Sequence, residues 1–365
     1  MLESVLLAGG GTAGHVNPLL AVAGELRSRG VGRITVLGTA EGLEADLVPA
    51  RGYPLVLVPR VPLPRRPTPE WLRLPGRLRH AVRLTERALD EAGAQVVVGF
   101  GGYVAAPAYL AARRRGIPVV VHEQNARPGL ANRLGALWAH SVAVTFPGTR
   151  LRHAQVTGLP LRQPIADLVA DLESDPAGTR RRAARALGLD PELATLLVTG
   201  GSLGAHRLNT VASGCAGDLV AAGVQVLHLT GVGKDGPVSD AVSGLDRYQV
   251  RPYLEDMHLA LAVADVVLAR AGAGTVSELT ALGLPAVYVP LPVGNGEQRR
   301  NAAPVVRAGG GLLVADADLD PAWVYANLLP LLREKSTRSR MAAAARTLGI
   351  RDGASRVADL VQAAA

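Results

Sequence analysis

The sequence has little of several residue types, and each shortage excludes a class of protein. With one cysteine, Cys215, among 365 residues, the chain cannot hold an intramolecular disulfide framework, and this usage fits a reducing cytoplasm. No apolar run reaches the roughly 20 residues that a helix needs to cross a bilayer. The first apolar run, from Leu2 to Ala8, is short and leads into glycines without a basic segment before it. We therefore expect no signal peptide.

Metal-binding patterns are also scarce. No histidines and cysteines stand at the spacing of a zinc site. Asp316-Ala317-Asp318 resembles the short acidic motif of metal-dependent sugar transferases, but it leads into Asp320-Pro321-Ala322-Trp323. That second pattern is typical of a helix cap with proline at the first helical position. We favour the cap interpretation and expect no bound metal.

Lysine is nearly absent, so arginine carries the basic charge, and the formal net charge is +8. The segment from Arg60 to Arg87 holds eight arginines against Glu70 and Glu86. Three interpretations are open: a surface that lies on anionic lipid, a nucleic-acid site, and a solvated helix face above core leucines. Since Trp71 is the segment's one aromatic residue for base stacking, we favour lipid over nucleic acid. The candidate membrane residues are Arg65, Arg66, Trp71, Leu72, Leu74, Leu78 and Arg79.

What the chain has in abundance is short apolar runs separated by helical patterns. Strands that alternate with helices predict βαβ units, parallel sheets and an α/β fold. In such folds ligands bind beyond the carboxyl ends of the strands. The predicted strands are Val5–Ala8, Ile34–Leu37, Val96–Val98, Val119–Val121, Val142–Val144, Thr195–Val198, Val224–Leu229, Val266–Leu268, Ala286–Val289 and Leu312–Val314.

The length predicts two domains, since a single core stops growing near 250–300 residues. The turn-rich stretch 157–164 follows the last strand of the first half. We place the boundary there, with one domain over 1–160 and the other over 161–344. The last stretch reads as helical without a strand, and we expect a helix at about 345–365 to pack back on the first domain.

Four glycine loops follow predicted strands, at 9–14, 99–103, 200–204 and 272–274. A glycine loop that enters a helix turns backbone N–H groups toward an anion, so a phosphate-bearing ligand is expected. The first loop fits G-x-G-x-x-G, but its second strand ends at Thr39 with no acidic residue before Glu41. A dinucleotide site needs an acidic residue there for the ribose. This departure argues against a nicotinamide or flavin enzyme.

Polar residues beside these loops are candidates for chemistry. His15 stands at a helix start, where an imidazole tends to stay neutral and can accept a proton; the alternative is a hydrogen bond to a loop carbonyl. Glu278 could accept from a ribose diol or complement a helix dipole. The cluster 122–125, His-Glu-Gln-Asn, could bind a polyhydroxylated ligand or form a plain polar loop.

These motifs, taken in order and spacing, resemble one family over essentially the whole chain. It is the MurG family, the N-acetylglucosaminyltransferases of bacterial cell-wall synthesis. The motifs that carry the resemblance are Gly10-Gly11-Thr12-Ala13-Gly14-His15, Gly99-Phe100-Gly101-Gly102-Tyr103-Val104, His122-Glu123-Gln124-Asn125, Gly200-Gly201-Ser202-Leu203-Gly204-Ala205 and Arg270-Ala271-Gly272-Ala273-Gly274-Thr275-Val276-Ser277-Glu278.

The resemblance implies a GT-B fold, in which two Rossmann-like parallel-sheet domains face each other across a cleft. It implies an inverting, metal-independent transfer of N-acetylglucosamine from UDP-GlcNAc to the C4 hydroxyl of the muramoyl sugar of lipid I, giving lipid II. The acceptor would bind the N-terminal domain and the donor the C-terminal one. The protein would lie peripherally on the anionic cytoplasmic face of the membrane, with cell-wall synthesis proteins as candidate partners and without nucleic acid.

The resemblance also implies residue roles. His15 would be the base, and Thr12, Ala13, Gly14 and Asn125 would face the transferred sugar. Arg162 and Ser202 would contact the diphosphate region, the main chain of Leu254 the uracil, Glu278 the ribose and Gln298 the sugar hydroxyls. The remaining donor contacts would come from Ala273, Gly274, Thr275, Val276 and Ser277. The chain reads Asn295-Gly296-Glu297 before Gln298, which departs from the family pattern and affects the sugar contacts.

Two other functions remain open from the sequence. One is a different GT-B enzyme, either a transferase with another lipid acceptor or a UDP-GlcNAc epimerase, although an epimerase would not need the basic segment. The other is a non-catalytic nucleotide-binding protein that docks on membranes or nucleic acid, which would not need His15.

Overall fold

The computed structural model describes residues 1–61, 70–201 and 204–365, and of residues 70–73 the backbone alone. The predictions for Arg65, Arg66 and Ser202, and for the side chains of Trp71 and Leu72, therefore lie outside the described residues. The chain forms two compact units. The first comprises Met1–Arg162 and Ile350–Ala365, and the second comprises Gln163–Gly349.

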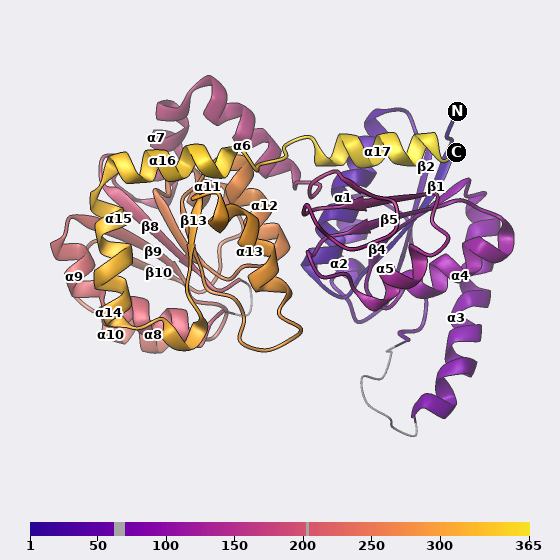
Figure 1. Cartoon of the computed structure of the whole chain (residues 1–365), viewed down its shortest axis with the longest axis horizontal. Coiled ribbons are helices and arrows are strands. Elements are labelled where there is room, and N and C mark those ends of the chain that lie inside the picture. The colour runs from indigo at the N-terminus through magenta and orange to yellow at the C-terminus, as the bar shows by residue number, and fades with distance from the viewer. Residues whose placement is uncertain (62–69, 202–203) are drawn as a thin grey trace. The chain divides into compact units, whose positions relative to one another are not determined.

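The first unit is built on a seven-stranded sheet in the order β3-β2-β1-β4-β5-β6-β7, and neighbouring strands pair in parallel (Figure 1). Its strands are β1 (Ser4–Gly9), β2 (Arg33–Gly38), β3 (Leu55–Leu57), β4 (Val96–Gly101), β5 (Val119–Glu123), β6 (Ser141–Val144) and β7 (Ala154–Val156). Its helices are α1 (Ala13–Ser28), α2 (Glu44–Ala50), α3 (Glu70–Ala92), α4 (Ala105–Arg115), α5 (Leu130–Gly135) and α17 (Gly353–Ala363).

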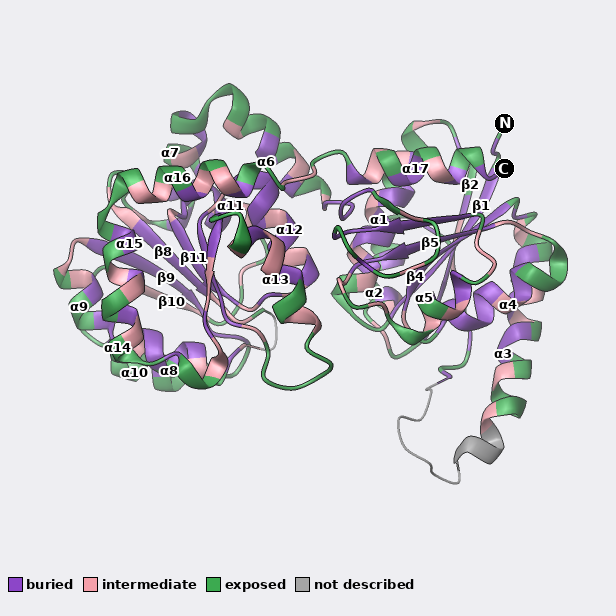
Figure 2. Cartoon of the chain, viewed as in Figure 1, coloured by how far each residue is buried: buried purple, intermediate pink, exposed green. Residues whose placement is uncertain are grey.

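The central strands of this sheet are apolar on both faces. Along β1, Val5 and Leu7 belong to one buried cluster, whereas Leu6 and Ala8 belong to another. Successive side chains of a strand point to opposite faces, so each face carries its own core under its own helices. Figure 2 shows these strands buried along their length and the helices exposed on one side only.

The C-terminal helix α17 packs on α1 in the first unit. Arg29, just after α1, donates to Asp359 Oδ1 at 2.6 Å, to Gln362 Oε1 at 2.8 Å and to Ser355 Oγ at 2.6 Å. Val357 and Val361 add fully buried side chains to the core beneath α1. The last residues of the chain are thus part of the unit that holds the first.

The second unit contains a six-stranded sheet in the order β10-β9-β8-β11-β12-β13, and its strands also pair in parallel. Its strands are β8 (Ala194–Thr199), β9 (Val224–Leu229), β10 (Tyr248–Arg251), β11 (Val266–Ala269), β12 (Ala286–Tyr288) and β13 (Gly311–Leu313). Its helices are α6 (Gln163–Ser174), α7 (Pro176–Leu187), α8 (His206–Gly214), α9 (Ala216–Ala221), α10 (Gly236–Ala241), α11 (Met257–Val263), α12 (Ala273–Leu282), α13 (Glu297–Arg307), η1 (Asp316–Asp318), α14 (Pro321–Trp323), η2 (Val324–Leu328), α15 (Leu329–Arg333) and α16 (Lys335–Arg346).

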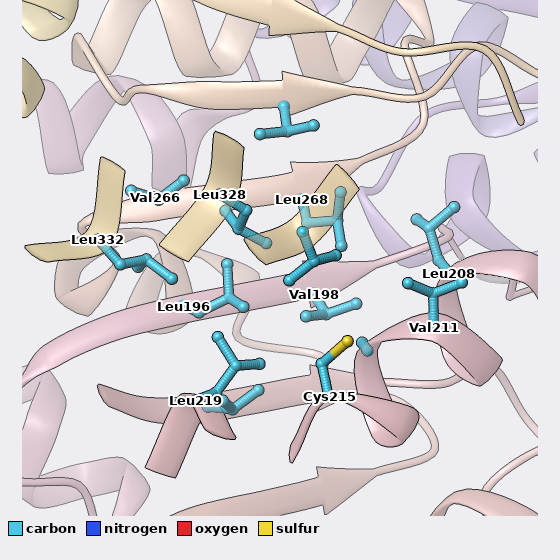
Figure 3. Close-up of a cluster of buried hydrophobic side chains, with 14 of the residues drawn as sticks. Leu196, Val198, Leu208, Val211, Cys215, Leu219, Val266, Leu268, Leu328 and Leu332 are labelled. Atoms are coloured by element: carbon cyan, nitrogen blue, oxygen red, sulfur yellow. The ribbon is translucent and has the colours of Figure 1, made fainter. Parts of the chain in front are cut away.

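The core of the second unit lies between this sheet and its helices. Figure 3 shows Leu196 and Val198 of β8 and Val266 and Leu268 of β11 pointing into a cluster that also takes in Cys215. The cysteine is free and buried. The prediction of two Rossmann-like α/β units, each with a parallel sheet, is confirmed.

Each sheet has one point where the strand order changes direction. In the first unit it lies between β1 and β4, and in the second between β8 and β11. Crevices at the carboxyl ends of strands at such a point are where open α/β sheets bind ligands. The four predicted glycine loops begin at the carboxyl ends of these four strands.

Candidate active site

In the first unit, the two glycine loops at the switch point are in direct contact. Gly9 of β1 pairs with Gly101 of β4 across a register shift. A Cβ atom on Gly102 would lie 2.5 Å from the carbonyl oxygen of Gly10. Gly101 and Gly102 have φ angles of +95° and +80°, which L side chains rarely adopt. Glycine is therefore required here both for backbone conformation and for space.

His15 lies above these loops, half-buried in the first turn of α1. Its Nδ1 lies 3.1 Å from the carbonyl oxygen of Gly10 and 3.2 Å from Oγ1 of Thr12. A carbonyl oxygen can only accept, so in the neutral ring Nδ1 carries the proton and donates it to Gly10. The lone pair then stands on Nε2. The loop-carbonyl hydrogen bond of the alternative interpretation is thus present, and it leaves Nε2 able to act as a base.

The surroundings of His15 favour the neutral form. Burial lowers the pKa of the imidazole, while the hydrogen bond to Gly10 and the charge of Glu44 act in the opposite direction. With a pKa below the usual value, His15 is neutral near pH 7. A general base needs this state.

The structure adds a residue that the sequence interpretation missed. Glu44, at the start of α2, is fully buried and accepts a hydrogen bond of 2.7 Å from the backbone N–H of Gly11. The dinucleotide fingerprint requires an acidic residue at the end of β2, where the sequence has only Glu41 nearby. The sequence feature that could have pointed to Glu44 is the pair of glycines shortly before it, Gly38 and Gly42.

The cluster at the end of β5 is mostly internal. His122, Glu123 and Gln124 are buried, and only Asn125 is half-exposed. Glu123 accepts from the backbone N–H of Asn125 at 2.9 Å and from Nδ2 of Asn132 at 2.9 Å. The idea of four polar groups facing a ligand is therefore wrong for three of them, because they hydrogen-bond within the unit.

The three residues before His15 are exposed to solvent. Thr12 is the N-cap of α1 and does not cap it with its side chain, and Ala13 and Gly14 form the exposed first turn. Arg162 is half-buried and is the last residue of the first unit before α6.

In the second unit, the switch point carries the N-terminus of α12. Gly272 is the N-cap, and no side chain caps the first N–H groups of this helix. Val276 and Ser277 are buried, whereas Gly274, Thr275 and Glu278 are half-buried. The N–H of Val276 donates to the carbonyl oxygen of Gly272 at 3.0 Å, so the N–H groups of α12 without a partner in the helix are those that precede it.

The side chain of Gln298, at the start of α13, hydrogen-bonds to the backbone just after β11 and β12. Its Oε1 accepts from the N–H of Ala271 at 3.2 Å and from the N–H of Leu291 at 3.0 Å. Asn301, one turn later, donates to the carbonyl oxygen of Ala271 at 3.2 Å. The amide oxygen of Gln298 is thus engaged within the protein, and the side chain can serve a ligand as a donor.

Leu254 is half-buried in the turn between β10 and α11.

The acidic pattern near the end of β13 has structural partners. Asp316 lies 2.5 Å from the guanidinium of Arg270, and Asp320 caps α14 by accepting from the N–H of Trp323 at 2.7 Å. The cap interpretation is confirmed.

Metal ligands do not gather in the described ranges. Among residues 1–61, 70–201 and 204–365, no three histidine, cysteine, aspartate or glutamate side chains stand together as a cation site.

The basic segment continues from Arg60 into α3. The guanidinium of Arg60 lies 4.1 Å from the ring centre of Tyr103, in the second glycine loop. On α3, Leu74 is half-buried, Leu78 packs against the core, and Arg77 and Arg79 are exposed. The apolar stripe beyond Leu78 therefore belongs to the unit's core, and the exposed face is basic. No helix within the described part of the chain is long and apolar enough to span a bilayer.

Known proteins resemble this chain along nearly all of its length. Residues 5–144 match the glycosyltransferase family 28 N-terminal domain and residues 195–357 its C-terminal domain. The UDP-N-acetylglucosamine--N-acetylmuramyl-(pentapeptide) pyrophosphoryl-undecaprenol N-acetylglucosamine transferase of Clavibacter sepedonicus is 57% identical over 360 residues, which cover 98% of this chain and 95% of the relative. The protein of the same name from Streptomyces coelicolor is 55% identical, covering 95% and 94%.

The chain belongs to the MurG family of glycosyltransferases. The solved structure of Acinetobacter baumannii MurG matches with a TM-score of 0.78 at 28% identity, covering 98% of this chain and 99% of that one. The GT-B fold prediction is confirmed by this match. The UDP-GlcNAc 2-epimerase of Neisseria meningitidis matches with a TM-score of 0.72 but at 16% identity, so it shares the fold alone. The MurG assignment is thus favoured over the epimerase alternative.

Proposed function

We propose that this protein transfers N-acetylglucosamine from UDP-GlcNAc to the C4 hydroxyl of the muramoyl sugar of lipid I, with inversion, to give lipid II and UDP. The observation that carries this proposal is the identity of 52–57% with the MurG transferases over almost the whole chain. The side chains and backbone groups of each unit can then be assigned to the steps of this transfer.

On the acceptor side, His15 supplies the base. Its Nε2 takes the proton of the C4 hydroxyl while that oxygen attacks C1 of the donor sugar. The bond between C1 and the β-phosphate oxygen breaks, and its electron pair leaves with UDP. The imidazolium then returns its proton to solvent. A general base of this kind contributes about 10²–10⁴-fold. Thr12, Ala13 and Gly14, which precede His15, and Asn125, which follows β5, contact the sugar that is transferred.

On the donor side, we assign the diphosphate to the N-terminus of α12. The first N–H groups of a helix have no partner within it and carry positive partial charge. Ala273, Gly274 and Thr275 supply these groups, and the open Gly272 cap leaves them accessible. Developing negative charge on UDP is stabilised by such preorganised dipoles. This arrangement gives the diphosphate a partner without a metal ion, and we propose a metal-independent reaction.

The other donor contacts follow from the same unit. Glu278, half-buried one turn into α12, accepts from the ribose hydroxyls, and the main chain of Leu254 pairs with uracil. The amide nitrogen of Gln298 donates to a hydroxyl of N-acetylglucosamine, because its oxygen is bound to Ala271 and Leu291. Arg162 and Ser202 complete the proposed contacts with the diphosphate region.

We also propose that the exposed arginines of α3 hold the protein on the anionic cytoplasmic face of the membrane, where lipid I is presented. Arg77, Arg79 and Arg83 are exposed on this helix, and each basic side chain near such a surface contributes about 1 kcal/mol. Peripheral attachment of this kind needs no spanning helix. Proteins of cell-wall synthesis are candidate partners at that surface.

The test is an assay of the purified full chain with UDP-GlcNAc and a short-chain lipid I analogue. We expect the disaccharide product and UDP in equal amounts, and an unchanged rate when EDTA is added. Absence of the disaccharide would refute the transferase assignment. A rate lost to EDTA and restored by a divalent cation would refute the metal-free reaction. A third arm omits the acceptor, and an epimerised UDP-sugar there would support the epimerase instead.

A further inference from the structure

The first glycine loop already contains an anion, and that anion is part of the protein. Glu44 is fully buried and its carboxylate has three donors. Oε2 accepts from the N–H of Gly11 at 2.7 Å, and Oε1 accepts from the N–H and from Oγ1 of Thr39, both at 2.8 Å. Both carboxylate oxygens are thus engaged.

Glycines surround this carboxylate. A Cβ atom on Gly10 would lie 2.2 Å from Oε1 of Glu44, and one on Gly42 would lie 2.0 Å from Oε2. A Cβ on Gly38 would lie 2.5 Å from the Cγ atom of Glu44. No other residue type leaves this space free. Within the first loop, Gly10 is thus required by a side chain of the protein and not by a ligand.

The occupied loop differs from a phosphate loop in its electrostatics. A loop of this kind normally turns its free N–H groups toward the phosphates of a ligand. Here the N–H of Gly11 donates to Glu44, so a phosphate at the same point would meet a negative charge. The first loop therefore does not offer the N–H of Gly11 to a phosphate.

One peptide group connects this carboxylate to His15. The N–H of Gly11 donates to Glu44, and the carbonyl of the same peptide, that of Gly10, accepts from Nδ1 of His15. Gly11 has a φ angle of +87° and neighbours another glycine, so this peptide has little intrinsic preference of its own. If it rotated by half a turn, its N–H would face Nδ1, and the ring proton would move to Nε2.

We propose that Glu44 is a positioning residue that fixes the orientation of the Gly10–Gly11 peptide and thereby keeps His15 in the tautomer that can act as a base. The proposal rests on the proposed function of His15. The relationship is that of a carboxylate behind a catalytic imidazole, with one peptide group between them. Its consequence is that the first loop serves the acceptor side and does not bind diphosphate.

Glu44 faces His15 from α2 through the Gly10–Gly11 peptide. From β5 and α4, Glu123 and Tyr109 stand behind Asn132, to which both hydrogen-bond. The charge that raises the pKa of His15 is that of Glu44. Removing that charge must therefore lower the pKa further.

The test is ¹⁵N NMR of the imidazole rings in the full chain, with the His15 signals identified by their loss in His15→Ala. We expect a protonated Nδ1 and a bare Nε2 in the unaltered protein. In Glu44→Gln an amide group replaces one oxygen, so the N–H of Gly11 and the N–H of Thr39 no longer each have an acceptor oxygen, and the hold on the Gly10–Gly11 peptide is weakened. We then expect mixed tautomers, a lower His15 pKa, and a kcat about 10–100-fold lower at unchanged KM for UDP-GlcNAc.

Two controls separate positioning from structural support. Glu41→Gln removes an exposed carboxylate three residues away and should leave the His15 spectrum unchanged. Thr39→Val removes a hydrogen bond from the same carboxylate but keeps its contact with Gly11, so it should keep the tautomer. Should Glu44→Gln not fold, Glu44→Asp retains the charge while its shorter side chain cannot reach Gly11, and it should show the mixed tautomers alone.

A folded Glu44 variant with the tautomer and pKa of the unaltered protein would overturn the proposal. The spectrum is read without any turnover, so it is independent of the base assignment. If His15→Ala retained full turnover while Glu44→Gln still altered the His15 ring, the proposed base would be wrong and the Glu44–His15 link would stand.

Discussion

Gly101 stands so close to His15 that a methyl group on its Cα would lie 3.1 Å from Nε2 of the imidazole. The φ angle of Gly101 is +95°, so alanine there would also strain the backbone. We expect Gly101→Ala to move the ring or block access to Nε2 and to lower turnover at least about tenfold. UDP affinity, measured by calorimetry, should stay unchanged because UDP is assigned to the other unit.

Gly116 offers a matched control for this substitution. It has a φ angle of +68° at the C-cap of α4, and nothing lies within 4 Å of an added Cβ. Gly116→Ala should therefore cost about 1 kcal/mol of stability from backbone strain and leave turnover unaffected. Equal losses of turnover in the two variants would contradict the steric account of Gly101.

The contacts of Gln298 predict a separation of donor-sugar binding from UDP binding. Gln298→Glu keeps an oxygen for Ala271 and Leu291 but replaces the amide donor with a second oxygen. We expect KM for UDP-GlcNAc to rise about tenfold while the Kd for UDP alone is unchanged. Gln298→Ala leaves both N–H groups without this partner, so it should weaken UDP binding as well. Identical effects of the two variants would contradict a role for the amide nitrogen.

Charge reversal on α3 tests the proposed membrane surface. Arg79 and Arg83 are exposed one turn apart, and Arg181 and Arg185 are exposed at the same spacing on α7. Reversing the α3 pair to glutamate should lower binding to anionic vesicles at least about tenfold in cosedimentation. The same reversal on α7 should have a smaller effect. Equal losses would show that binding follows net charge alone.

Two buried histidines predict a loss of stability in mild acid. Burial lowers the pKa of His122 and of His228 to about 4, against a usual value of 6.5. Below about pH 6.5 these two histidines therefore become protonated in the unfolded chain but stay neutral in the folded chain. Above about pH 6.5 the two histidines are neutral in both states and cost no stability. As the pH falls toward 4, the free energy of unfolding decreases by up to about 3 kcal/mol for each histidine. Urea unfolding at pH 7.5, 6.0 and 5.0 measures this, and a constant free energy of unfolding would contradict it.

The central strands were predictable because they are apolar on both faces, as Val96–Val98 illustrates. Three strands were missed, and all are at sheet edges: β3, β7 and β10. An edge strand is covered on fewer sides and so needs fewer apolar residues, as Gln155 in β7 and Arg251 in β10 show. β7 and β10 therefore carry no clear apolar run, whereas β3 is apolar throughout, as Leu55-Val56-Leu57, and could have been recognised from the sequence.

The candidate site was predictable where it depends on glycine, since glycine marks a backbone that other residues cannot adopt. The function of each glycine was less accessible. Gly10 is needed for the carboxylate of Glu44, which comes 34 residues later and meets the loop only after folding. For the same reason the sequence could not show that His122 and Glu123 point inward, or that the oxygen of Gln298 is already engaged.

The turnover of His15→Ala shows whether His15 is the base of a lipid I transferase. The assay uses saturating UDP-GlcNAc and a lipid I analogue, with the UDP affinity of the same variant measured in parallel. If His15 is the base, kcat falls by at least about 10²-fold while UDP affinity is retained. Turnover within about threefold of the unaltered protein, or a loss of UDP binding that accounts for the whole effect, would contradict it.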